Sequence, residues 1–132
     1  MILINMIKMI FFFSLFITHN NWEKYYEDKD ILISYTSQVC DDKANAFTFE
    51  YFLIKVENKT NETLVVNFQK SNEQINRLED KVAFVLNPNQ IIEGTCEYNT
   101  NQLRIFKSEN TIKDSDFNYE FELSKIEVIE VY

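Results

Sequence analysis

The sequence has few of the residues on which most catalytic and metal sites depend. Its 132 residues include one glycine, one proline, one histidine and two cysteines. A single glycine cannot supply a GxGxxG or Walker phosphate loop, and two cysteines are too few for a thiolate zinc site. We therefore expect no catalytic residue, no cofactor and no metal, and we expect that the chain is not an enzyme.

The longest apolar run, residues 9–17, lies near the N-terminus. A short start with Lys8 as its only charge precedes this run, and polar residues follow it. This order is typical of a secretory signal peptide, and the run is shorter than the ~20 residues of a spanning helix. We expect residues 1–21 to form a signal helix that is cleaved somewhere within 18–22. Cleavage there would remove His19 or leave it at the new terminus, which excludes Ser-His-Asp and Cys-His catalysis. The alternative is an uncleaved anchor, which would be the chain's membrane contact.

The chain is strongly acidic. Asp and Glu outnumber Lys and Arg by 21 to 13, which gives a formal net charge of -8. Such a domain repels phosphate backbones, so we expect no nucleic-acid partner. Hydrophobic residues make up 45% of the chain, enough for a packed core in one domain of this length. We expect that domain to be residues 22–132, secreted or periplasmic.

Past residue 22 the hydrophobic residues recur with a period of two, which is typical of strands. Polar turns separate the runs, and no βαβ rhythm is present. These features predict an all-β fold, a single immunoglobulin-like antiparallel β-sandwich. The alternating runs are 31–39, 48–57, 64–68, 82–86, 90–98, 103–106 and 117–128.

Four local predictions follow from this pattern. Runs 48–57 and 64–68 flank a polar turn, which predicts a hairpin. Gly94, inside run 90–98, indicates a bulge or a close backbone approach. The alternation slips at Ser124 and Lys125, which predicts a β-bulge. The polar stretch 71–80 fits either a short helical turn or a loop.

The two cysteines, Cys40 and Cys96, favour a disulfide over two free thiols if the chain is exported. A disulfide that closes the loop between Cys40 and Cys96 would stabilise the fold by about 4 kcal/mol in the chain-entropy model. A catalytic thiol is disfavoured because the mature chain has no histidine to pair with it.

Two further motifs have simple structural interpretations. The carboxylate run 114–120 superficially resembles a calcium loop, but Tyr119 replaces the loop glycine and Lys125 replaces the final Glu. It is better explained as the solvent face of a strand. The glycosylation sequons that begin at Asn58 and Asn61 are interpreted as hairpin-turn chemistry.

Three aromatic residues, Tyr51, Tyr98 and Phe106, face outward by parity and form a candidate binding face. The alternative is that a central strand is partly covered on both sides. We expect a non-catalytic binding module of unknown target, in contact with an envelope or extracellular protein. The other hypothesis is an acidic inhibitor, or chaperone-like partner, of a basic envelope enzyme. Its contact carboxylates would be Asp41, Asp42, Glu79 and Asp80.

The segment 50–106 contains a recognisable series of residues: Val56, Asn58, Lys59 and Thr60, then Leu64 to Phe68, then Leu86, Pro88, Glu93, Gly94 and Cys96. In these residues it resembles small secreted proteins of Bacteroidetes that have no assigned function. The resemblance implies export and a bacterial envelope setting, and it implies no activity.

Overall fold

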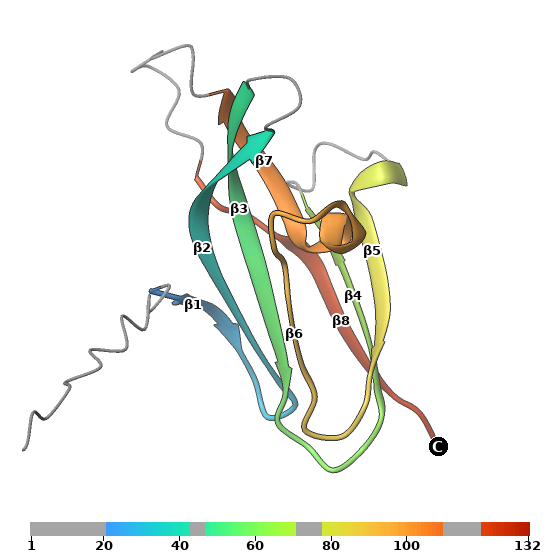
Figure 1. Cartoon of the computed structure of the whole chain (residues 1–132). Coiled ribbons are helices and arrows are strands. Elements are labelled where there is room, and N and C mark those ends of the chain that lie inside the picture. Colours follow the sequence, from blue (N-terminus) through green and yellow to red (C-terminus); the bar gives the residue numbers. More distant parts are fainter. Residues whose placement is uncertain (1–20, 43–46, 71–77, 110–119) are drawn as a thin grey trace, which may run out of the picture.

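The computed structural model describes residues 21–42, 47–70, 78–109 and 120–132. These residues form eight strands and two short 3-10 helices (Figure 1). The strands are β1 (Glu23–Glu27), β2 (Ile31–Asp42), β3 (Phe47–Asn58), β4 (Leu64–Gln69), β5 (Lys81–Leu86), β6 (Ile91–Glu93), β7 (Arg104–Glu109) and β8 (Ser124–Glu130). The helices are η1 (Leu78–Asp80) and η2 (Tyr98–Leu103). The predicted signal helix lies outside the described residues, and no helix within them is long and apolar enough to span a membrane.

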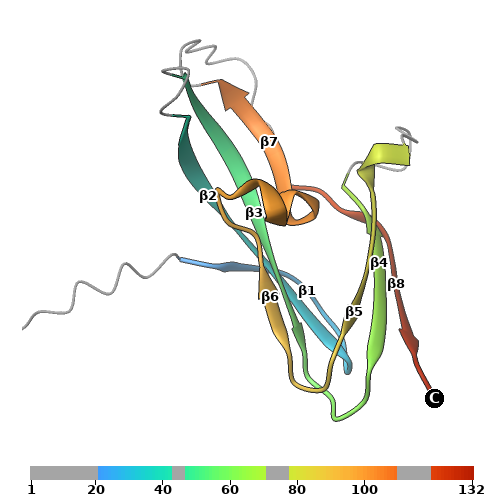
Figure 2. The same ribbon diagram turned by 45° about the vertical axis from the view of Figure 1, so that its right-hand side comes forward.

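The strands form two antiparallel sheets, which confirms the all-β part of the prediction. The five-stranded sheet has the order β1-β2-β3, with β6 and β7 both paired to the far edge of β3. The three-stranded sheet has the order β5-β4-β8. Figure 2 shows the two sheets close together at the β3–β4 connection and diverging toward the far end of β7. Their facing sides share one core, which includes Ile33, Ile54, Val56, Leu64, Val66 and Leu86.

The register of β2 and β3 determines which side chains face outward. The two strands pair without interruption from Ile31 opposite Asn58 to Asp42 opposite Phe47. Ile54 on β3 is buried in the core, so its neighbour Leu53 faces the other side of the sheet. The candidate binding surface lies on that outer face, along the part of β3 that pairs with β7.

The hairpin predicted from runs 48–57 and 64–68 is wrong. These runs form β3 and β4, which belong to different sheets: β3 pairs with β2, β6 and β7, and β4 pairs with β5 and β8. The polar connection 59–63 arches from one sheet to the other. Local alternation specifies a strand and its buried face but not its partner, which is why the sequence did not reveal the change of sheet.

Asn58 holds this arch together from inside. Its side chain is 1% exposed, and its amide nitrogen donates to the carbonyl oxygens of Glu62 at 2.8 Å and Asn87 at 3.0 Å. Its Oδ1 accepts from the amide and the hydroxyl of Thr60. The sequon at Asn58 therefore serves turn chemistry, as predicted, although the turn is an arch rather than a hairpin.

The strand predicted for 90–98 ends early, because β6 stops at Glu93. The amide of Gly94 still bonds to the carbonyl of Ile54 at 2.8 Å. A Cβ on Gly94 would overlap the carbonyl oxygen of Leu103, so the predicted close backbone approach is confirmed. We call residues 94–103 the crossover loop. This loop leaves the edge of β3, and β7 then pairs with β3 again.

The bulge predicted at Ser124 and Lys125 is confirmed. Lys125 has a φ of 52°, and the β4–β8 register shifts opposite it, between Asn67 and Gln69. The predicted run 117–128 is a strand only from Ser124 onward among its described residues. The sequence pattern did not predict β1. For the stretch 71–80, where a helical turn or a loop was expected, the described residues form the helical turn η1.

Candidate binding surface

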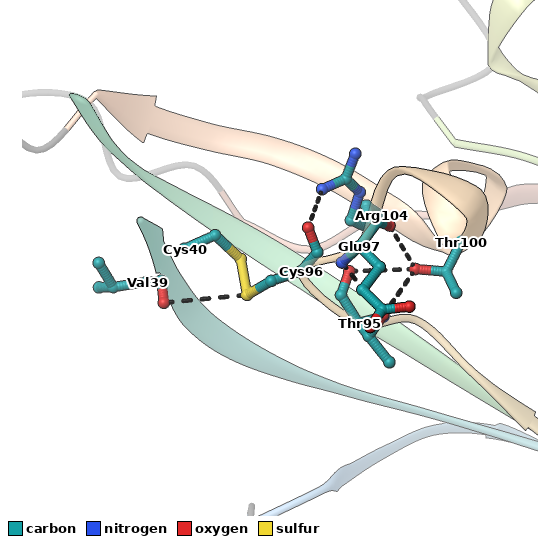
Figure 3. Close-up of a disulfide and its surroundings, with 7 residues drawn as sticks. All are labelled: Val39, Cys40, Thr95, Cys96, Glu97, Thr100 and Arg104. Carbon is teal, nitrogen blue, oxygen red and sulfur yellow. Dashed lines mark hydrogen bonds between the residues drawn. A yellow bond between two sulfur atoms is a disulfide. The ribbon is translucent and has the colours of Figure 1, made fainter. Parts of the chain in front are cut away.

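A disulfide ties the crossover loop to the five-stranded sheet. Cys40, near the end of β2, is bonded to Cys96 of the loop, with their Cα atoms 5.5 Å apart (Figure 3). Because β6 and β7 lie on the opposite edge of β3 from β2, the loop passes over the outer face of β3. Leu53, on that face, is 1% exposed. The predicted disulfide is confirmed, and it points to an oxidising, extracytoplasmic environment.

Three aromatic rings cluster beside this loop. The ring centroid of Tyr51 lies 5.9 Å from that of Phe106 and 6.5 Å from that of Phe49. Phe49 and Phe106 are 6.1 Å apart. These separations are typical of interacting aromatic pairs. Phe106 is nevertheless 52% exposed, so the cluster is open to solvent.

The structure brings all three predicted aromatic residues to this surface. Tyr51 and Phe106 are in ring contact, and Tyr98, 82% exposed on η2, lines a hollow together with Tyr51. Sequence reasoning missed Phe49 and Arg104. Both could have been found by parity, since Phe49 lies two residues before Tyr51 and Arg104 two before Phe106. We call these five residues the aromatic face.

Two hollows adjoin at the aromatic face, and Tyr51 and Arg104 line both. The first, of about 440 Å³, also contains the disulfide, Asp41 and Tyr98, and we call it the disulfide hollow. The second, of about 480 Å³, is lined in addition by Lys70, Asp80, Asn101 and Phe106, and we call it the Lys70 hollow.

A third hollow, of about 320 Å³, lies against the three-stranded sheet. Its charged lining residues are Lys81, Lys125 and Glu127. It has no aromatic ring other than that of Phe68, which is 3% exposed. This hollow therefore has charge but little exposed aromatic surface.

Arg104 is the central polar residue of the aromatic face. Its guanidinium carbon lies 4.6 Å from the ring centroid of Tyr51, within the range of a cation–π contact. Its Nη1 donates to the carbonyl oxygen of Cys96 at 3.1 Å, as Figure 3 shows. Its Nε is buried without a hydrogen-bond partner. The disulfide-bonded loop thus positions this side chain while leaving part of its donor capacity unused.

Lys70 contributes a second cation from the other sheet, just after β4. Its Nζ donates to the carbonyl oxygens of Arg104 at 3.1 Å and Asn101 at 3.3 Å. Burial lowers the pKa of Lys70, although the nearby carboxylate of Asp80 acts in the opposite direction. Lys70 lines the Lys70 hollow, and neutral backbone oxygens hold its ammonium group.

The carboxylates of the inhibitor hypothesis do not lie in one hollow. Asp41 lines the disulfide hollow, and Asp80 lines the Lys70 hollow. For Asp42 and Glu79 the structure describes the backbone and not the side chain. Within the described part of the chain, no three His, Cys, Asp or Glu side chains gather in a way that could hold a metal ion.

Comparisons of this chain with protein-family models, with curated proteins and with solved structures find no match.

Proposed function

We propose that this chain is a secreted or periplasmic binding module, without catalytic activity, whose contact surface is the aromatic face. The observation that carries the proposal is the open aromatic cluster at Tyr51, held beside a disulfide-bonded loop. Exposed aromatic side chains that are already fixed lose little conformational entropy on binding, and with Arg they are enriched where binding energy concentrates.

The proposed scaffold is an immunoglobulin-like sandwich. Its support is the strand arrangement: β3 lies between β2 and the β6–β7 edge, and β4 lies between β5 and β8. The chain changes sheet after β3, β5 and β7. Such domains commonly bind through surface loops carried by a rigid framework, which is the position of the crossover loop here.

Two features support the proposed compartment. The N-terminal sequence has the order of a signal peptide, and the Cys40–Cys96 disulfide requires an oxidising environment to persist. An acidic inhibitor of a basic enzyme is the weaker proposal, because Asp41 and Asp80 lie in separate hollows, each of which also contains a cation.

The proposal is tested by retention of material from an extracellular and envelope extract on the immobilised exported chain. Phe106→Ser is compared with Ile129→Ser, because both side chains are 52% exposed and they lie on different sheets. We expect Phe106→Ser to lose most of the retained material and Ile129→Ser to keep it. Equal retention by the two variants would overturn the proposal.

A further inference from the structure

Two cations meet at the aromatic face without a carboxylate bonded to either. Among the described residues, the ion pairs are Lys24–Glu27, Lys59–Glu27 and Lys107–Glu50. Lys70 and Arg104 instead contact backbone carbonyl oxygens and the ring of Tyr51. In a chain where acidic residues outnumber basic ones by 21 to 13, the absence of an ion pair at either described cation is unexpected, and the carboxylate of Asp80 acts on Lys70 from the same hollow without pairing with it.

The side chains of Lys70 and Arg104 are also partly buried, so leaving their charges unbalanced costs free energy. Both are only partly exposed, and the Nε of Arg104 is buried without a hydrogen-bond partner. A guanidinium has five N–H donors in a planar fork that fits a carboxylate, and a lysine ammonium has three donors. The Lys70 hollow holds these two cations and one carboxylate, that of Asp80, so an anion bound there would balance the second positive charge.

The remaining lining residues indicate what carries that anion. Tyr51 and Phe106 offer aromatic surface, on which the flat apolar side of a ring can pack. Asn101 and Asp80 add polar groups suited to hydroxyl groups at the same hollow. A ligand that combines a carboxylate, a ring with an apolar side, and hydroxyl groups is an acidic sugar.

We propose that the Lys70 hollow binds acidic polysaccharide, with a uronic-acid carboxylate against Lys70 and Arg104 and the sugar ring against Tyr51 and Phe106. This inference rests on the proposed function and names its ligand class. Because the chain as a whole is negatively charged, long-range attraction does not favour an anion. Recognition therefore depends on short-range contacts with the two cations and the rings.

The first experiment measures binding of short oligogalacturonates, oligoglucuronates and alginate oligomers to the full exported chain by calorimetry. We expect at least one to bind, and we expect methyl esterification, which removes the charge but keeps the sugar, to weaken it by about tenfold or more. Failure of all three to bind would overturn the proposal. Equal binding of the methyl ester, or equally tight binding of an oligoglutamate peptide, would also overturn it.

The second experiment locates the site. Lys70→Met and Arg104→Gln should each weaken binding by about tenfold, whereas Lys81→Met and Lys125→Met, at the third hollow, should change it by less than about twofold. All four variants lose one positive charge, and urea unfolding checks that each is folded. Equal weakening by all four would show non-specific attraction and overturn the assignment. Failure of the wild-type chain to bind any of the three oligomers, together with normal retention of extract material, would refute the sugar and leave the proposed function intact.

Discussion

The disulfide between Cys40 and Cys96 joins β2 to a loop that leaves from the opposite edge of β3. The carbonyl of Cys96 also accepts a hydrogen bond from Arg104, which lies over Tyr51. One covalent bond therefore fixes both the loop and the cation at the centre of the aromatic face.

Replacing the disulfide should lower stability substantially. The bond closes a loop with a sequence separation of 56 residues, which corresponds to about 4 kcal/mol in the chain-entropy model. We expect Cys40→Ser with Cys96→Ser to reduce the free energy of unfolding by about that amount, measured by urea denaturation. Thiol titration of the denatured wild-type chain should find no free thiol before reduction. Two free thiols without reductant would contradict the structure.

Adding a methyl group at Gly94 should also destabilise the fold. The new Cβ would overlap the backbone oxygen of Leu103, which cannot move without displacing the crossover loop. We expect Gly94→Ala to cost about 1–3 kcal/mol of unfolding free energy. Asn99→Ala, at an exposed position of the same loop, should change it by less than about 0.5 kcal/mol. A Gly94→Ala chain as stable as the wild type would show that the close approach is not required.

The buried amide of Asn58 should matter more than its exposed neighbour Asn61. Truncation to alanine at 58 removes the hydrogen bonds from its amide to the carbonyls of Glu62 and Asn87, and it leaves the Thr60 amide without its buried acceptor. We expect Asn58→Ala to lower the free energy of unfolding by about 2–3 kcal/mol, and Asn61→Ala to change it by less than about 0.5 kcal/mol. Thermal and urea unfolding measure both variants, and similar losses at the two positions would contradict this role for Asn58.

Asp28 should make part of the stability depend on pH. Burial acts to raise the pKa of Asp28, but the amides of Ile31 and Asp30 and the hydroxyl of Tyr26 outweigh it and hold the pKa below its usual range. A lowered folded pKa stabilises the fold above the unfolded value of about 3.9, and this contribution is lost as pH falls through the folded pKa. Asp28→Asn should therefore be less stable than the wild type near neutral pH, with a gap that narrows below about pH 4. Urea unfolding across pH 2–7 measures the gap, and a constant gap would refute the assignment.

The local features of the fold were predictable because they depend on neighbouring residues. The alternation located most strands, the slip at Ser124 and Lys125 located the bulge, and the lone Gly94 marked a close approach. The disulfide was predictable once export was inferred. These features follow from side-chain period, backbone sterics and compartment.

The parts that could not be predicted depend on which distant segments meet. Alternation gives the same pattern for a hairpin as for the arch between β3 and β4. Lys70 and Arg104 are far apart in the sequence, and they meet because the end of β4 lies near the start of β7. The absence of an ion pair at either of these two described side chains is a property of this tertiary contact.

The most direct test of the aromatic face as the contact surface is site-specific photo-crosslinking. A benzoylphenylalanine is introduced at Tyr98, on the aromatic face, or at Val85, which is exposed on the three-stranded sheet, and each chain is irradiated in envelope extract. We predict that position 98 forms a discrete crosslinked product, which excess unlabelled wild-type chain suppresses, and that position 85 does not. Equal crosslinking from both positions, or a discrete product only from position 85, would contradict the aromatic face as the contact surface.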